Sequence, residues 1–177
     1  MKSIEIKGKR NIDKFKKLED PEIKNERSII QKWDKNILQD FESHDSQLRM
    51  INKCYLNVNP LPNKELFLKE IQKKIDGYKR QDIEKELYDE NYFLKFENVL
   101  QTLVESGLKC YYCKCKVYII YSEVLCKCQW TIDRIDNDYG HNNNNIVIAC
   151  YECNVRRGTM DSERFKFGKQ LKLIKKE

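Results

Sequence analysis

The chain has 177 residues, of which 40% are hydrophobic and 35% are charged, with a formal net charge of +6. This length and composition suit one globular domain with a modest appended region, and they exclude a large multidomain assembly. No apolar run approaches the roughly 20 residues that span a bilayer, and the N-terminus lacks the residue order of a secretory signal peptide. We therefore expect an intracellular protein, cytoplasmic or nuclear, with no membrane partner.

Apolar residues recur at three- and four-residue steps in the first part of the chain, which predicts a helical N-terminal region over residues 1–105. Three such stripes are present, at residues 29–41, 67–75 and 93–104. The second is expected to end near Gly77, and the third stops at Gly107, a residue type common after the last turn of a helix. The stripes predict core positions.

After Gly107 the composition changes to short β-branched and aromatic runs separated by turn-forming residues. Strands are predicted at residues 117–121, 130–133 and 145–149, with a loop at 136–144 and a short helix from Tyr151 to about Gly158. Four consecutive asparagines, residues 142–145, lie where this loop meets the last predicted strand.

Cysteine is the most informative residue type, because seven of the eight lie between Cys110 and Cys153. Cys110 and Cys113 form one C-x2-C pair, Cys150 and Cys153 form a second, and 36 residues separate the pairs. Two such pairs complete the tetrahedral sulfur site that structural zinc prefers. A disulfide framework is the alternative if the protein is exported.

The remaining cysteines do not form a pattern of comparable strength. Cys115, Cys126 and Cys128 make C-x-C pairs with their neighbours, and Cys54 is remote in sequence. Together they form either a second zinc site or ordinary free thiols.

Several segments in this part of the chain occur in an order typical of a known nuclease core. They are Asp133-Arg134-Ile135-Asp136-Asn137, Gly140-His141, Asn145 to Cys150, Cys153-Asn154 and Arg157-Gly158. With the two cysteine pairs, this order resembles the ββα-metal core of the HNH endonuclease superfamily, most closely the phage- and giant-virus-type members with a D-R-I-D motif. The resemblance covers about residues 110–160.

The resemblance implies a role for particular residues. Asp133 matches the aspartate at the end of the first strand, and Asn154 matches the helical residue that completes the protein ligands of one catalytic Mg²⁺ or Mn²⁺ ion. Carboxylate and amide oxygens suit these hard cations. Asn145 matches the asparagine that holds the loop by hydrogen bonds. The four cysteines would hold zinc in a treble clef without taking part in chemistry.

One position departs from the family pattern. The residue after the strand-ending aspartate is usually the histidine that accepts a proton from the attacking water, and here it is Arg134, which stays protonated. His141 and Asp136 are the nearby candidates for the missing base, and a cleavage step without a side-chain base is the third alternative. Arg134 is better suited to hold a phosphate.

Basic residues follow the motif. Residues 156–177 contain eight lysines and arginines against three acids. Phosphate contacts require such charge, so the candidate nucleic-acid contacts are Arg134, Arg156, Arg157, Arg164 and Lys166. The alternative is a solvated cationic face.

Together these features predict an α+β protein with a helical region (1–105), a zinc-stabilised HNH-like domain (106–160) and a basic tail (161–177). The expected function is a metal-dependent DNA endonuclease or nickase, virus-encoded if the resemblance to viral members extends to its source. A catalytically weak or inactive zinc module that binds nucleic acid is the alternative. The helical periodicity does not distinguish DNA recognition, homodimer formation or binding of another protein.

Overall fold

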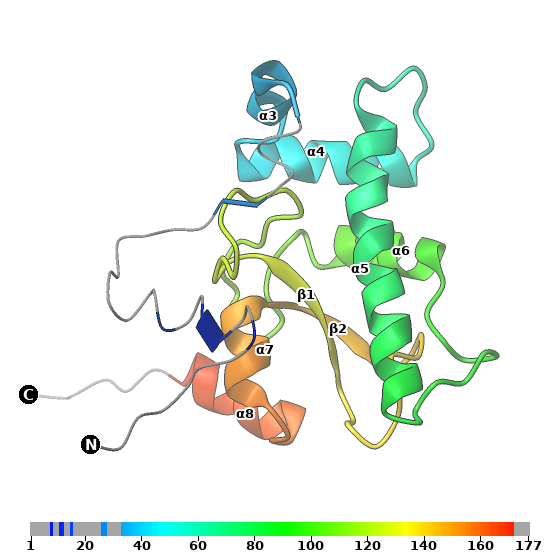
Figure 1. Ribbon diagram of the computed structural model, residues 1–177, viewed down its shortest axis with the longest axis vertical. Helices are drawn as coiled ribbons and strands as arrows, with labels where there is room; N and C mark the ends of the chain where they lie inside the picture. The colour runs from blue at the N-terminus through cyan, green and yellow to red at the C-terminus, as the bar shows by residue number, and fades with distance from the viewer. Residues whose placement is uncertain (1–7, 9–10, 13–14, 16–25, 28–32, 172–177) are drawn as a thin grey trace, which may run out of the picture.

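The computed structural model describes residues 8, 11, 12, 15, 26, 27 and 33–171. Its elements are α3 (Lys35–Asp40), α4 (His44–Tyr55), α5 (Lys64–Glu84), α6 (Phe96–Glu105), β1 (Trp130–Arg134), β2 (Ile146–Cys150), α7 (Tyr151–Arg157) and α8 (Ser162–Gln170). The expected α+β class is confirmed in its coarse form, as helices around a two-stranded sheet. In Figure 1 the long helix α5 runs beside the hairpin, whereas α7 and α8 lie on its other side.

The two strands form an antiparallel hairpin close to the predicted positions. Trp130 of β1 lies opposite Cys150 of β2, and Arg134 lies opposite Ile146. The connecting loop therefore spans residues 135–145, one residue longer at each end than expected. This hairpin brings the end of β1, where Asp133 stands, next to the start of β2.

The third predicted strand, residues 117–121, is not a strand. Only Tyr118 within it forms an isolated bridge, to Gln129. The backbone N–H groups of Ile119 and Ile120 donate instead to the side-chain Oε1 of Gln47, at 2.8 and 3.0 Å. Because a buried glutamine satisfies these donors, the segment packs without a neighbouring strand.

The helices differ from the predicted stripes mainly in length. The first stripe falls partly on residues 28–32, outside the described residues, and its described part contains the short helix α3. Helix α4 was not predicted, although Ser43 caps it by accepting a hydrogen bond from the Ser46 N–H at 3.0 Å. Helix α5 continues past Gly77 to Glu84, and its part beyond Gly77 contains the buried Asp82. Helix α8 occupies residues 162–170 of the expected tail.

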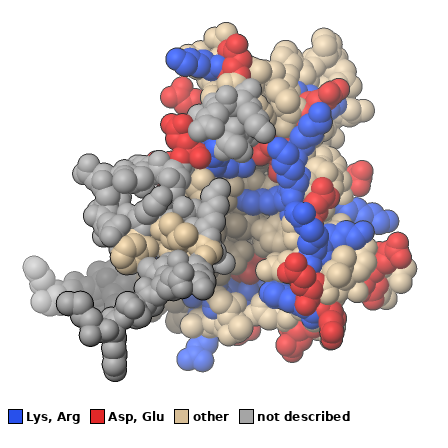
Figure 2. Space-filling model, in the orientation of Figure 1, with Lys and Arg blue, Asp and Glu red and all other residues tan. Residues whose placement is uncertain are grey.

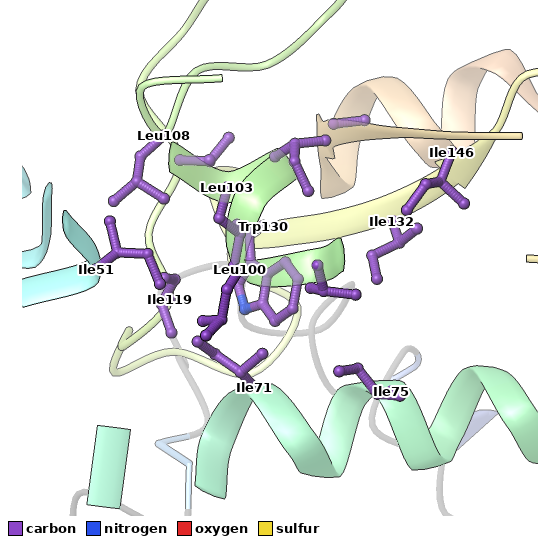
Figure 3. Packing of buried hydrophobic residues seen from close by; sticks show 14 of the residues in the cluster. Ile51, Ile71, Ile75, Leu100, Leu103, Leu108, Ile119, Trp130, Ile132 and Ile146 are labelled. Carbon is purple, nitrogen blue, oxygen red and sulfur yellow. The ribbon is translucent and has the colours of Figure 1, made fainter. Parts of the chain in front are cut away.

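One hydrophobic core joins the helical region to the hairpin. Figure 3 shows Ile51 of α4, Ile71 and Ile75 of α5, Leu100 and Leu103 of α6, and Trp130 and Ile132 of β1 packed together. These side chains come from both sides of the boundary that the sequence suggests near residue 105. The helices therefore form part of the structure that supports the hairpin.

Three polar side chains of α5, spaced four residues apart, attach the helix to the hairpin, two of them at the open edge of β1 and the third at the loop. Lys74 donates to the carbonyl oxygen of Trp130, and the Tyr78 hydroxyl accepts from the Ile132 N–H at 2.9 Å. Asp82 accepts from the His141 N–H at 2.6 Å. Side chains at this spacing share one face of a helix, so α5 covers the edge of β1 at Trp130 and Ile132 and reaches the loop at His141.

Lys74 is expected to make stability depend on pH. Burial lowers the pKa of this lysine to about 7, and the positive charge of Arg27 acts in the same direction. Between about pH 7 and the ordinary value of 10.5, the unfolded chain then binds a proton that the folded chain has lost, so stability rises with pH in this range. Lys74→Met should lack this rise, as measured by urea unfolding across the range.

The control is Lys73→Met, a change at the neighbouring exposed lysine, which should keep the pH profile of the unaltered protein. Parallel profiles for the unaltered chain and Lys74→Met would contradict the prediction.

Within the part of the chain that the structure describes, none of the helices combines the length and apolar character needed to cross a bilayer.

Candidate metal centre and hairpin–helix site

The two C-x2-C pairs meet in space. The sulfur atoms of Cys110, Cys113, Cys150 and Cys153 all lie within 4.8 Å of one another, and those of Cys113 and Cys150 are 3.9 Å apart. Zinc–sulfur bonds of about 2.3 Å place tetrahedral ligands about 3.8 Å from each other. The four thiols therefore form a cluster that could hold a metal ion such as zinc.

Local backbone geometry points these thiols inward. Lys114 adopts a left-handed φ of 61°, which turns the chain after the first pair, and the Cys110 N–H donates to the Cys115 carbonyl at 2.9 Å. At the second pair, the Cys150 sulfur accepts the Cys153 N–H at 3.4 Å and so caps α7. Each pair lies in its own turn. The spacing of the cysteines within each pair was therefore sufficient to predict that both thiols face the same site.

The cluster already favours a thiolate. A hydrogen bond from the Cys150 thiol is the largest cause that lowers the pKa of Cys110, to about 4, and the pKa of Cys150 is raised in return because it is the donor. Since thiolates are the metal-binding form, one of the four ligands is prepared for a cation.

The other cysteines lie outside this cluster. Cys54 is buried in α4, where burial raises its pKa, while Cys115, Cys126 and Cys128 are half-buried thiols. Among the described residues, no second group of three metal-ligating side chains is close enough to share an ion.

Asp133 lies at the contact between β1 and α7. Its Oδ2 accepts a hydrogen bond from the Tyr112 hydroxyl at 2.6 Å, and its Oδ1 accepts one from Arg157 at 2.9 Å. Burial is the largest influence on this carboxyl and raises its pKa, against the opposing effects of Tyr112 and Arg157. Asp133 is thus a buried group whose two oxygens both have protein donors.

Asn154 lies at the same contact, one residue after the last cysteine of the cluster. Its Nδ2 donates to the carbonyl oxygen of Ile132, the residue before Asp133, at 3.3 Å. Its side-chain oxygen accepts no hydrogen bond from the described residues. We call Tyr112, Asp133, Asn154 and Arg157 the hairpin–helix site.

Arg157 does not lie where a nucleic-acid contact would need it, so that prediction requires correction. Its side chain is 0% exposed and forms an ion pair with Asp133. It also donates to the carbonyl oxygens of Arg134 and Ile135, at 2.7 and 2.9 Å. The guanidinium fills the contact between α7 and the end of β1 because these three acceptors surround it.

The other four predicted phosphate contacts are more accessible. Arg134 is half-buried and donates to the Asn137 and Tyr139 carbonyls, Lys166 contacts the Tyr111 hydroxyl at 2.7 Å, and Arg164 is exposed. Arg156 has a side chain that is 62% exposed and lies 3.6 Å from Glu152.

The loop between the strands is held by Asn145. Its Oδ1 accepts the Asp136 N–H at 2.8 Å, and its Nδ2 donates to the carbonyls of Asp136 and Gly140, at 2.8 and 3.1 Å. The candidate base Asp136 is exposed in this loop, where its carboxylate accepts the Asp138 N–H.

His141, one of the two candidates for the general base, is buried. Its Nδ1 lies 2.7 Å from Asp82 Oδ1, and its ring packs on Tyr78 with centroids 4.4 Å apart. Asp82 is 59 residues away in sequence and carries no local signal of this pairing. The contacts hold the loop against α5 and do not bring His141 to Asp133.

Comparison with known proteins identifies no relative: no family model, no curated protein and no solved structure matches this chain.

Proposed function

We propose that the protein is a metal-dependent DNA endonuclease or nickase, in which Asp133 and Asn154 hold one Mg²⁺ or Mn²⁺ ion. The observation that carries the proposal is that both side chains lie at the β1–α7 contact, and that Asn154 directly follows the last cysteine of the thiol cluster. A zinc ion bound there would keep this strand and helix in register.

The residues fit a hard divalent cation by their chemistry. A carboxylate offers about four acceptor positions, and the two hydrogen bonds to Asp133 use only two of them. The free side-chain oxygen of Asn154 is a second hard ligand. When bound, such an ion polarises the scissile phosphate and stabilises the leaving oxygen.

The chain's own residues would position the substrate. Arg134, which is half-buried, and the exposed Arg156 lie close in sequence to Asp133 and Asn154 and carry the charge that phosphates require. The described contacts bring no neutral side-chain base to Asp133, and loss of such a base typically costs about 10²- to 10⁴-fold in rate. We therefore expect slow cleavage.

A plasmid-relaxation assay with Mg²⁺ or Mn²⁺ tests the proposal. Asn154→Ala should reduce cleavage at least about 100-fold, because it removes a ligand of the ion that stabilises transition-state charge. Asn144→Ala, at an exposed loop asparagine, is the matched control and should cleave normally. Divalent ions should be omitted rather than chelated, since a chelator would also remove zinc. Unchanged cleavage by Asn154→Ala contradicts the assignment.

Two observations favour a second function, a zinc module that binds nucleic acid without cutting it. The ion pair between Asp133 and Arg157 neutralises the carboxylate that would hold the catalytic ion, and Arg134 stands where the family has a base. Salt-sensitive DNA binding without cleavage in either metal would support this alternative.

A further inference from the structure

An open cavity of about 520 Å³ lies at the loop that connects β1 and β2, and we call it the loop pocket. Asn91 and Tyr92 line it from the segment before α6, while Asp136, Tyr139 and residues 142–145 line it from the loop. None of these residues belongs to the hairpin–helix site. Because ligand sites are usually cavities lined by aromatic and a few polar side chains, the loop pocket is a candidate binding site of its own.

Backbone contacts hold the two lining segments together. Phe93 and Asn142 form an antiparallel bridge, and the Asn143 N–H donates to the Tyr92 carbonyl at 3.1 Å. The Lys95 N–H donates to the side-chain oxygen of Asn143 at 3.2 Å. The pocket is therefore formed by the fold itself, and a ligand that enters it has little chain to order.

Two exposed tyrosines line the loop pocket from these distant segments. The side chain of Tyr92 is 64% exposed and that of Tyr139 is 61% exposed. Among the described residues, neither ring packs on another ring or lies under a cation. Since the face of a tyrosine ring attracts ammonium and guanidinium groups, both rings are available to a cationic ligand.

Carboxylates outnumber cations around the loop pocket. Residues 85–95 and 134–145 contain the acids Glu86, Asp89, Glu90, Asp136 and Asp138, against the cations Lys85, Lys95 and Arg134. Both segments lie at the C-terminal, lower end of α5 in Figure 1, where Figure 2 shows several Asp and Glu side chains.

The protein itself does not neutralise these acids. Among the described residues, none of the five forms an ion pair with a lysine or arginine. Arg134 donates instead to the carbonyls of Asn137 and Tyr139, at 3.2 and 3.0 Å. Lys79 of α5 lies near Glu90, and the acids remain in excess. The region therefore repels phosphate groups and attracts cations.

Two oxygen atoms of the pocket residues lack a hydrogen-bond donor. One Asp136 oxygen accepts the Asp138 N–H at 2.9 Å, and the other accepts no hydrogen bond from the described residues. The side-chain oxygen of Asn142 is buried and likewise has no donor among them. Of the described residues that line the pocket, none is a lysine or an arginine. A fitting ligand therefore supplies both donors and positive charge.

We propose that the loop pocket binds an arginine side chain of a basic partner protein. A guanidinium group is a planar cation that stacks on aromatic rings, and it has five N–H donors and no acceptor. These properties match the two tyrosine rings, the open oxygen of Asp136 and the excess of acids. The inference goes beyond DNA cleavage, because the pocket and the hairpin–helix site share no residue.

The probe is a short labelled peptide with two arginines between glycines and serines. Its affinity for the full chain is measured by fluorescence anisotropy at low salt. The double variant Tyr92→Ala/Tyr139→Ala should bind it at least about fivefold more weakly, since one cation–π contact is worth about 2- to 30-fold in affinity. The control Tyr55→Ala/Phe167→Ala removes two exposed aromatic rings elsewhere and should bind normally. Thermal unfolding of both variants checks that the fold is intact.

A second peptide, in which citrulline replaces both arginines, tests the charge. Citrulline has nearly the shape of arginine but is neutral, so this peptide should bind at least about tenfold more weakly. Equal affinity for the two peptides, or an equal loss in the two double variants, overturns the inference. Absence of saturable binding up to about 1 mM of the arginine peptide also overturns it.

A short DNA duplex, used without divalent ions, distinguishes a nucleic-acid ligand. If Tyr92→Ala/Tyr139→Ala weakens binding of the duplex and leaves binding of the arginine peptide unchanged, the pocket holds nucleic acid and the inference is overturned. Failure of the proposed nuclease activity would leave the peptide result unaffected, because that assay contains no DNA.

Discussion

The purified chain is expected to bind one zinc ion, and Cys113→Ser is expected to release it and to destabilise the fold severely. Structural zinc contributes on the order of 10 kcal/mol in small zinc-dependent modules. The metal would join the turn after α6, which contains Cys110 and Cys113, to Cys150 at the end of β2 and Cys153 in α7. Loss of the metal would remove this connection. We expect the free energy of unfolding to fall by more than about 5 kcal/mol.

Zinc content by mass spectrometry of the native protein and denaturant unfolding measure the two effects. Cys128→Ser is the matched control, because Cys128 is a half-buried thiol outside the cluster. It should keep one zinc ion and nearly the stability of the unaltered chain. Retention of one tightly bound zinc ion by Cys113→Ser would show that the four thiols are not the ligands.

Arg157→Met is expected to have the second largest effect on stability. The substitution leaves the buried Asp133 carboxylate without its cation and removes donors from two backbone carbonyls. Breaking one partner of a buried ion pair costs about 3 to 5 kcal/mol. Arg156→Met, one residue earlier on the exposed side of α7, should cost less than about 1 kcal/mol.

The stability that Arg157→Met loses should depend on pH, and the direction follows from the pKa of Asp133. Burial already raises the pKa of Asp133 above its ordinary value of 3.8, and removal of Arg157 raises it further. Between pH 3.8 and the raised pKa of Asp133 in the folded chain, the folded state holds a proton that the unfolded state has lost. Stability therefore falls as pH rises through this range. Arg157→Met should therefore lose least stability in acid, where Asp133 is neutral.

Asp133→Asn, added to Arg157→Met, tests the cause. It removes the unpaired charge and should recover part of the stability at neutral pH, as measured by denaturant unfolding. Equal stability of Arg157→Met and Arg156→Met would rule out the proposed importance of the ion pair.

Features with a local signal were predictable from the sequence. The C-x2-C pairs each form a turn with their own backbone hydrogen bonds, so their spacing was sufficient to group Cys110 and Cys113 with Cys150 and Cys153. The end of α7 was equally local: Gly158 follows Arg157 with a positive φ of 54°, a conformation that glycine adopts without strain.

Features that join distant segments were not predictable in the same way. Nothing near His141 in sequence indicates that Asp82 is its partner, or that Gly140 must lack a side chain because one would overlap the carbonyl oxygen of Leu87. Likewise, the β-branched run at 117–121 has strand propensity but no strand beside it, since Gln47 takes two of its backbone donors.

The sequence by itself determined which residues gather at the thiol cluster and that Asp133 and Asn154 belong to one strand–loop–strand–helix segment. Only the tertiary structure decided that Arg157 is buried against Asp133, that His141 faces α5, and that Lys74 and Tyr78 of α5 contact the backbone of β1. The physical reason is that a turn is specified by neighbouring residues, whereas the burial and pairing of a charge depend on side chains that folding brings from far along the chain.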